Sequence, residues 1–266
     1  MLTYPNIDPV IFNIYGHLSV RWYSLAYIFG YLILCWWFKK KNNEHNFMSN
    51  ENCDKLNLWI IFGVIIGARF FDCMIYHTSE TLKDITSVFR IWEGGMSFHG
   101  GVIGTATAVL IFSKIHKVST MKILDYCVII APICLFFGRI TNFINAELYG
   151  NITYTSPFRM IFPTDYTQQP RHPSQLYEAF TEGICLFFIM LFFYKKTNLI
   201  KTPGVMTGLF GIFYSIARFI CEFFRSPEVS NFFNLTAGQL LSIIMFLIGI
   251  LIVIISNKRF AKIKKS

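Results

Sequence analysis

Charged residues are scarce in this chain of 266 residues, at 15% of the sequence, against about 25% in typical soluble domains. Hydrophobic residues supply 54% and aromatic residues 18%. This balance excludes an ordinary soluble domain and indicates a membrane protein with several spans. The formal net charge of +9 does not indicate nucleic-acid binding, because nucleic-acid readers cluster their basic residues on one folded face. Here the lysines lie in short loops between apolar segments, so we expect no nucleic-acid partner.

Motifs that hold metals or cofactors are also absent from the sequence. The seven cysteines lie mostly inside apolar segments and form no Cys-x-x-Cys or other metal-ligand spacing. We therefore expect no metal and no cofactor. The first apolar stretch is not preceded by a basic segment, which predicts that no signal peptide is cleaved.

Seven apolar segments each approach the roughly 20 residues that cross a bilayer. The expected fold class is therefore an all-α polytopic membrane protein with seven transmembrane helices, a single transmembrane domain over residues 1–266. Residues 147–175, which contain four prolines, are expected to form a small periplasmic cap between spans four and five. The expected spans are about 19 to 38, 56 to 76, 96 to 113, 123 to 144, 176 to 194, 203 to 224 and 236 to 256.

Basic residues in short loops indicate the orientation, because such loops stay on the cytoplasmic side. Alternate loops hold 15 of the 24 basic residues, which places the N-terminus outside and the C-terminus in the cytoplasm. Of these 15 residues 14 are lysine, whereas eight of the other nine are arginine. The 15 are Lys39, Lys40, Lys41, Lys55, Lys114, Lys117, Lys122, Lys195, Lys196, Lys201, Lys258, Arg259, Lys262, Lys264 and Lys265.

The arginines of the outer side indicate an anion site. The planar fork of arginine binds phosphate or carboxylate through two hydrogen bonds, whereas lysine is a hydrated point charge. Arg139 follows a long apolar run and begins a polar segment that includes Asn142, Asn145 and Glu147. A charge within the bilayer costs about 2.5–3.5 kcal/mol on insertion scales. We expect a functional or structural contact to offset that cost.

The sixth expected span carries a polar stripe. Tyr214, Arg218, Glu222 and Arg225 fall within an arc of about 80° on one helix face. Such a stripe on an apolar helix must face the interior of the bundle. Glu222 cannot neutralise both arginines, which leaves one positive charge for a ligand; a structural charge network between spans is the alternative. For Arg69 and Asp72, three residues apart, the structural ion pair is favoured.

A histidine opens the third expected span. His99 is followed by Gly100, Gly101 and Gly104, which permit close approach of a backbone or a ligand. The start of a helix also directs free N–H groups at an anion. An imidazole in this place can move protons, or it can serve only as a hydrogen-bond donor. Tyr23 is either a functional residue or an aromatic anchor at the membrane interface.

These segments together resemble the prolipoprotein diacylglyceryl transferases, the bacterial enzymes that begin lipoprotein maturation. The resemblance covers nearly the whole chain and keeps the expected order of motifs. One departure is Thr141, where the family usually has Gly or Ala. The matching blocks are Arg21 to Tyr23, Gly67 to Arg69, Gly94 to Gly101, Gly138 to Gly150, Arg171 to Glu178 and Tyr214 to Arg225.

The resemblance implies that the sn-1,2-diacylglyceryl group moves from phosphatidylglycerol to the lipobox cysteine thiol of a prolipoprotein signal peptide, and glycerol phosphate is released. It also implies a multi-pass protein of the bacterial cytoplasmic (inner) membrane, with the site toward the outer leaflet. His99 is the expected general base or proton relay, and Arg139 and Arg218 the expected phosphate ligands. The catalytic candidates are His99, Arg139, Arg218, Tyr23 and Tyr214. The candidates for phosphatidylglycerol binding are Arg139, Asn142, Asn145, Glu147, Gly150, Arg218, Glu222, Arg225, Gly100, Gly101, His172 and Gln175.

Other classes of membrane protein explain less of the sequence. An anion transporter needs polar residues along a route across the bilayer, but the inner halves of the spans are apolar except near Asp125. A structural envelope protein accounts for ion pairs but not for the separation of arginine from lysine. A CDP-alcohol phosphatidyltransferase needs an aspartate-rich metal motif, which the sequence lacks.

Overall fold

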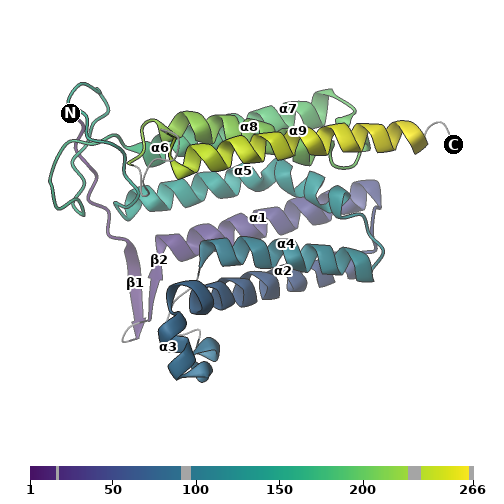
Figure 1. Cartoon of the computed structure of the whole chain (residues 1–266), viewed down its shortest axis with the longest axis horizontal. Helices are drawn as coiled ribbons and strands as arrows, with labels where there is room; N and C mark the ends of the chain where they lie inside the picture. The colour runs from purple at the N-terminus through teal and green to yellow at the C-terminus, as the bar shows by residue number, and fades with distance from the viewer. Residues whose placement is uncertain (16–17, 91–96, 227–234, 264–266) are drawn as a thin grey trace. The chain divides into compact units, whose positions relative to one another are not determined.

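The structure is a computed structural model that describes residues 1–15, 18–90, 97–226 and 235–263. It is mainly helical, with a two-stranded hairpin near the N-terminus (Figure 1). The elements are β1 (Val10–Tyr15), β2 (Leu18–Arg21), α1 (Trp22–His45), α2 (Asn50–Phe71), η1 (Asp72–Tyr76), α3 (Thr78–Lys83), η2 (Ile85–Phe89), α4 (Phe98–Ile115), α5 (Thr120–Ile144), α6 (Ser174–Glu178), η4 (Ala179–Cys185), α7 (Leu186–Lys196), η5 (Leu199–Lys201), α8 (Val205–Glu222) and α9 (Ala237–Ile263).

Five helical segments within the described ranges are long and apolar enough to cross a membrane. They correspond to the expected spans two, four, five, six and seven, and they confirm a helical membrane protein. Gly100–Ile115, which overlaps the third expected span, is a shorter apolar helix. The five segments are Asn50–Met74, Thr120–Ile144, Ser174–Lys196, Val205–Glu222 and Ala237–Lys262.

The expected start of the first span is wrong. Leu18–Arg21 form the strand β2, and α1 runs from Trp22 to His45 instead of from 19 to 38. β1 pairs antiparallel with β2, with Val10 opposite Arg21. β1 is rich in β-branched and aromatic residues, which favour strands. The chain therefore enters α1 through a hairpin that the hydropathy pattern did not reveal.

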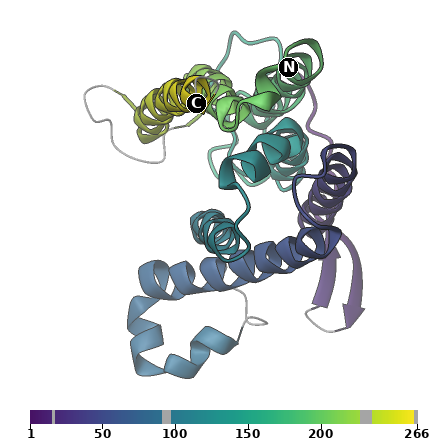
Figure 2. The ribbon, with the colours of Figure 1, turned by 90° about the vertical axis from the view of Figure 1, so that its right-hand side faces the viewer.

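The chain divides into two compact units, Phe38–Thr120 and Met1–Trp37 with Met121–Ser266. In the smaller unit α2 and α4 pack together, and Figure 2 shows the chain after α2 (blue) turning through the short elements η1, α3 and η2. In the larger unit α8 and α9 lie side by side (Figure 1).

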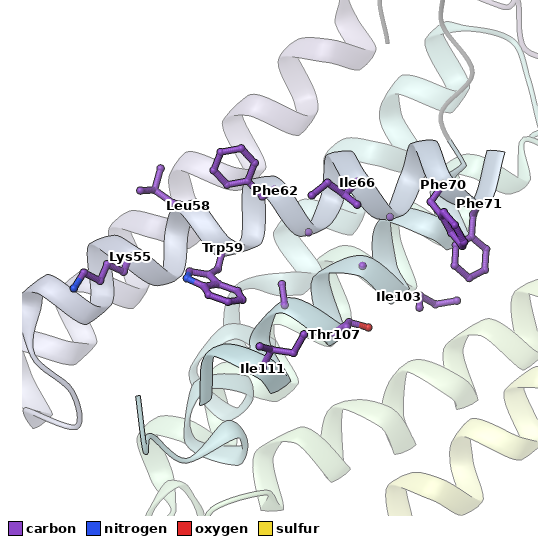
Figure 3. A pocket seen from close by; sticks show the side chains of 14 residues that line it. Lys55, Leu58, Trp59, Phe62, Ile66, Phe70, Phe71, Ile103, Thr107 and Ile111 are labelled. Atoms are coloured by element: carbon purple, nitrogen blue, oxygen red, sulfur yellow. The ribbon is translucent and has the colours of Figure 1, made fainter. Parts of the chain in front are cut away.

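Glycines bring α2 and α4 into backbone contact. A Cβ atom added at Gly67 would collide with the carbonyl oxygen of Gly100, and one at Gly104 would collide with that of Gly63. An apolar groove of about 630 Å³ follows the same helix pair, with Lys55 at one end and Phe70 and Phe71 at the other (Figure 3). The small residues therefore serve helix packing, and the groove presents carbon surface of the kind that lipid chains solvate.

Arg69 holds the short helices that follow α2. Its guanidinium donates hydrogen bonds to the backbone oxygens of Ser87, Val88 and Arg90 at the end of η2. One nitrogen also lies 3.8 Å from the carboxylate of Asp72, which approaches His77 at 3.1 Å. Arg69 is 8% exposed. These contacts favour the structural alternative for Arg69 and Asp72.

Asp125 joins α5 to the start of α8. Its carboxylate accepts hydrogen bonds from the backbone N–H of Gly204 at 2.6 Å and from the N–H and hydroxyl of Thr207 at 2.8 and 2.6 Å. The first turn of a helix has free N–H donors and favours negative charge. Asp125 is 1% exposed, so this acidic residue in an apolar helix serves as a helix cap supplied from another helix.

Residues 145–173 form an ordered connection between α5 and α6. Phe143, Ala146, Met160 and Phe162 form a small hydrophobic core there. The Tyr4 hydroxyl donates to the carbonyl oxygens of Phe143 and Ile144 at 2.8 and 2.9 Å, so the N-terminal segment completes the end of α5.

A buried ion pair fixes the second half of this connection. Arg171 donates to the carboxylate of Asp165 from two nitrogens, and its guanidinium lies 4.9 Å from the ring centre of Tyr149. The backbone N–H of Arg171 also donates to Met160 at 2.8 Å. The hydrogen bond from Arg171 lowers the pKa of Asp165 to about 2.

Replacing Asp125 by Ala is expected to lower the free energy of unfolding by about 1–3 kcal/mol, because donors of Gly204 and Thr207 lose a buried acceptor. Thermal unfolding in detergent measures the effect. Asp54→Ala is the control, since Asp54 forms an exposed pair with Lys39 and such pairs contribute little. Equal shifts for both variants would contradict the capping role.

Asp165 makes the connection sensitive to acid. A carboxyl group whose folded pKa is depressed contributes stability above its unfolded pKa, and that contribution is lost as the pH falls through the folded value. The window therefore runs from 3.8 down to about 2. We expect Asp165→Asn to be less stable than the parent protein at about pH 5, with the difference shrinking toward about pH 2. Denaturant titrations over this range measure it, and a constant difference would contradict the ion pair's role.

Candidate active site

Arginines from two helices meet one pair of buried carboxylates. Arg139 of α5 lies 3.0 Å from Glu178, and its Nε and Nη2 donate to Glu182 at 3.3 and 3.1 Å. Arg218 of α8 lies 2.8 Å from Glu178 and 3.6 Å from Glu182. Both glutamates are 0% exposed. The carboxylates therefore tie α5 to α8 through α6 and η4.

The rest of the polar stripe on α8 joins the same network. Arg218 Nη2 lies 2.7 Å from Glu222, one turn along the helix. Arg225, just beyond the end of α8, lies 3.3 Å from Glu178. The stripe therefore faces the interior of the larger unit, as its helical spacing predicted. We name Arg139, Glu178, Glu182, Arg218, Glu222 and Arg225 the charge cluster.

Glu182 lies in a π-helical turn that interrupts the α-helix of the fifth expected span. Ala179–Cys185 form the π-helix η4 between α6 and α7, and π-helical turns are frequent at functional sites. Gly183 lies against Phe136 of α5 so closely that a Cβ would come 2.7 Å from the Phe136 side chain. Because Phe136 is about one turn from Arg139, this close approach brings the Glu182 carboxylate to the guanidinium of Arg139.

Glu222 connects the charge cluster to α9. Thr236 caps α9 by accepting from the N–H of Gln239 at 3.1 Å, and its hydroxyl donates to Glu222 at 3.0 Å. A Cβ on Gly238 would come 2.5 Å from the Glu222 carboxylate. The first turn of α9 thus points its positive end at this carboxylate, and only glycine leaves room for it.

The formal charges of the cluster balance. Three guanidinium groups face three carboxylates, and Glu178 alone contacts all three arginines. The expectation that Glu222 would leave one arginine uncompensated is therefore wrong, because Glu178 and Glu182 supply the missing negative charges. The sequence does contain a signal for this pair: two glutamates four residues apart in the apolar fifth span, hence on one helix face.

The end of α5 folds Glu147 back over Asn142. The N–H of Glu147 donates to the carbonyl of Asn142 and that of Ala146 to Phe143, the pattern of a Schellman helix end. Ala146 has a φ of 52°, a left-handed conformation that usually requires glycine. Asn142 then donates to the Glu147 carboxylate at 2.7 Å, and Asn145 donates to it at 3.3 Å.

Backbone contacts join the segment that carries Asn142, Asn145 and Glu147 to the charge cluster. Gln175 donates to the carbonyl of Glu147 at 2.6 Å. The N–H of Gly150 donates to His172 at 2.8 Å, and Gly150 forms a bridge with Arg225. A Cβ on Gly150 would collide with the carbonyl oxygen of Phe224, so the absent side chain serves a backbone crossing. The His172 ring lies 3.2 Å from the Tyr177 hydroxyl, and burial lowers the pKa of His172.

Tyrosines of α8 and α1 lie near these groups. Tyr214 stacks on Phe210 with ring centres 5.8 Å apart and lies in the neighbourhood of Glu182 and Arg139. The Tyr23 hydroxyl lies 3.1 Å from that of Tyr27. Tyr27 in turn lies in the neighbourhood of Arg139 and Glu147. Sequence reasoning singled out Tyr23 but missed Tyr27, although the two are one turn apart on α1.

His99, Gly100 and Gly101 belong to the smaller unit. They form the first turn of α4, where Ser97 accepts a hydrogen bond from the N–H of Gly100 at 3.3 Å. The side chain of His99 and residues 91–96 lie outside the described part of the structure. Gly100 faces the backbone of α2, which gives it a packing role. Contact of His99, Gly100 or Gly101 with a substrate stays a prediction.

The structure thus brings together most of the residues that the sequence singled out in the larger unit. Within the described ranges no three His, Cys, Asp or Glu side chains are placed to hold a metal ion. The chemical groups gathered around the charge cluster are guanidinium, carboxylate, amide and phenol. Such groups can bind an anion, orient its neighbours and exchange protons.

Comparisons with known proteins agree with this chemistry. The family model described as prolipoprotein diacylglyceryl transferase matches residues 9–255. Proteins named phosphatidylglycerol--prolipoprotein diacylglyceryl transferase are similar over almost their full lengths. The one from Rickettsia bellii is 43% identical over 259 residues, covering 95% of this chain and 97% of that protein.

Two further relatives with the same name show comparable similarity. The protein of Rickettsia felis is 40% identical over 264 residues, covering 97% of this chain and 100% of the relative. That of Rhodospirillum rubrum is 39% identical over 263 residues, covering 97% of this chain and 95% of the relative. With a family match from residue 9 to residue 255, the chain belongs to the prolipoprotein diacylglyceryl transferase family.

Proposed function

We propose that this membrane enzyme transfers the diacylglyceryl group of phosphatidylglycerol to the lipobox cysteine of a prolipoprotein signal peptide, the first step of lipoprotein maturation. The observation that carries the proposal is the charge cluster, in which Arg139 and Arg218 share Glu178 and Glu182. Two guanidinium groups held by common carboxylates can contact one phosphate. The family and the names of its members supply the reaction.

The proposed orientation has seven spans, with the charge cluster toward the outer leaflet of the bacterial inner membrane. Residues 147–175 then form the extracytoplasmic cap of a single transmembrane domain. Support comes from the larger unit. Asp125 and Gly204 meet near Lys122 and Lys201, and Arg139 lies 14 residues farther along α5, about 21 Å in a helix. Lysines and guanidinium cluster thus lie at opposite ends of α5, as expected when lysines mark the cytoplasmic side.

Both arginines retain donors for a phosphate. A guanidinium has five N–H groups; contacts with the glutamates of the charge cluster at 3.3 Å or less engage three N–H groups of Arg139 and two of Arg218. The side chains are 18% and 15% exposed, so each keeps a route to a ligand. Phosphate oxygens bound in this way are stabilised as negative charge develops on the leaving group.

The proposed reaction is a displacement at carbon. The cysteine sulfur forms a bond to the glyceryl carbon, the carbon–oxygen bond to phosphate breaks, and glycerol phosphate leaves with the electron pair. The thiol proton must be removed, because the thiolate is the nucleophile. His99 is proposed as base or proton relay, with Tyr23 and Tyr214 as phenolic groups near the reacting atoms.

The side-chain amides near the end of α5, those of Asn142, Asn145 and Gln175, are proposed to bind the glycerol headgroup. Asn142 and Asn145 are held by Glu147, and Gln175 by the backbone of Glu147. Gly150 and His172 define the adjoining backbone crossing. Glu222 and Arg225 are proposed to complete the phosphate site from α8, and Gly100 and Gly101 to contact the lipid from α4.

Reconstitution in liposomes with phosphatidylglycerol and a lipobox peptide tests the proposal. The parent protein is expected to form a thioether product, detected by mass spectrometry. Arg139→Ala is expected to lower kcat/KM at least about 100-fold, because about 2.7 kcal/mol or more of charge stabilisation is lost. Glu51→Gln, which alters an exposed carboxylate, is the control. Solute flux without product would favour an anion transporter, and neither result would favour a structural protein.

The variant Arg218→Lys tests whether the planar geometry of the guanidinium matters in addition to its positive charge. Lysine keeps the positive charge but cannot contact Glu178 and Glu222 together as the Arg218 fork does. We expect kcat to fall at least about tenfold, since the bidentate geometry is lost. Steady-state kinetics with phosphatidylglycerol measure it. A variant as active as the parent would assign Arg218 a role of charge alone.

A further inference from the structure

The carboxylates of the charge cluster differ in how their oxygens are used. Glu178 contacts Arg139 at 3.0 Å, Arg218 at 2.8 Å and Arg225 at 3.3 Å. One oxygen of Glu182, Oε2, accepts both hydrogen bonds from Arg139. The other, Oε1, lies 3.6 Å from Arg218 and is buried without a hydrogen-bond donor in the described part of the chain.

The balanced charges of the cluster create a difficulty for anion binding. With three arginines and three glutamates, the cluster has no surplus positive charge for a lipid phosphate. Phosphatidylglycerol adds one negative charge, and net charge is costly in a region of low dielectric. A phosphate bound to the remaining N–H groups of Arg139 and Arg218 also shares their positive charge with Glu178 and Glu182. The ion pairs of Glu178 and Glu182 with these arginines are then weaker, although both carboxylates stay buried.

We propose that the Glu178–Glu182 pair takes up one proton when the phosphate of phosphatidylglycerol binds to Arg139 and Arg218, so that the substrate is held in a neutral complex. This inference rests on the function proposed above. Three carboxylate oxygens of the charge cluster accept no hydrogen bond from the described residues: Oε2 of Glu178, Oε1 of Glu182 and Oε2 of Glu222. Oε1 of Glu182 is the acceptor that the geometry favours, because its nearest guanidinium lies 3.6 Å away, whereas the other two lie 3.0 and 2.7 Å from an arginine nitrogen. A carboxyl group that loses opposite charge while buried binds a proton more tightly. Glu182 is in this sense a positioning residue that sets the charge of the site.

Titratable groups from three elements lie near Glu182 in the described part of the chain. They include Arg139 from α5, Glu178 from α6, and Tyr214, Arg218 and Cys221 from α8. The Cys221 thiol is itself hydrogen-bonded to Thr181 at 3.1 Å. Glu222 contacts the other terminal nitrogen of Arg218, and it accepts a hydrogen bond from the Thr236 hydroxyl. The proton therefore goes to a carboxylate of the pair.

Proton uptake can be measured directly on the parent protein. The purified protein in weakly buffered detergent with a pH indicator is mixed with micelles of phosphatidylglycerol, or of zwitterionic phosphatidylcholine as the control lipid. We expect uptake approaching one proton per bound phosphatidylglycerol and none with phosphatidylcholine. Lipid binding is followed separately by retention of labelled lipid. Binding of phosphatidylglycerol without proton uptake would overturn the proposal.

Variants then assign the proton to Glu182. Glu182→Gln carries a neutral side chain permanently, so proton uptake is expected to vanish. In the parent protein KM for phosphatidylglycerol should rise with pH, by up to about tenfold per pH unit for one linked proton. In Glu182→Gln this dependence should disappear. Glu182→Asp, which keeps a carboxylate, should restore uptake, and the exposed Glu51→Gln control should behave as the parent.

A merely structural role for Glu182 gives a different pattern. Glu182→Gln would then raise KM equally at every pH, and the parent would show no proton uptake. The outcomes also separate this inference from the proposed function. Thioether formation without proton uptake would refute only the inference. Proton uptake on phosphatidylglycerol binding, with no thioether formed from a lipobox peptide, would refute only the transfer reaction.

Discussion

The larger unit depends on one interaction, the sharing of two fully buried glutamates by arginines of other segments. Glu178 and Glu182 link α5 to α8, and Glu222 extends the link to α9 through Thr236. Buried charges are tolerated only when they are paired and hydrogen-bonded. Removing one member would leave its partners unpaired in an apolar surrounding. The charge cluster therefore fixes the helices around it, while Arg139 and Arg218 stay partly exposed.

Both ends of α5 use the same physical solution in different ways. At one end the Asp125 carboxylate accepts hydrogen bonds from N–H groups at the start of α8. These contacts give Asp125 a structural role. At the other end Arg139 is held by carboxylates yet stays partly exposed. Charge within an apolar helix is thus not by itself a sign of function. The difference lies in whether hydrogen-bonding capacity remains after the structural contacts are made.

Much of this arrangement could be predicted from the sequence. Apolar length located five of the spanning helices, and helical spacing placed Arg218 and Glu222 on one face. Partners supplied by another segment could not be predicted in this way. Glu182 reaches Arg139 from the π-helix η4, which packs against α5 through Gly183. The hairpin before α1 was also missed, because its apolar strands run directly into the first apolar span. The left-handed Ala146 was missed because a residue other than glycine rarely adopts a positive φ.

The neutrality of the charge cluster also bears on turnover. In the proposed reaction the phosphate leaves with an added negative charge, so a site with surplus positive charge would hold the product more tightly than the substrate. Binding both ground state and product strongly does not raise the rate of a chemical step. Carboxylates that compete with the phosphate for Arg139 and Arg218 weaken this retention. In the proposed reaction, the glutamates that neutralise Arg139 and Arg218 would therefore also limit how long the released anion stays bound.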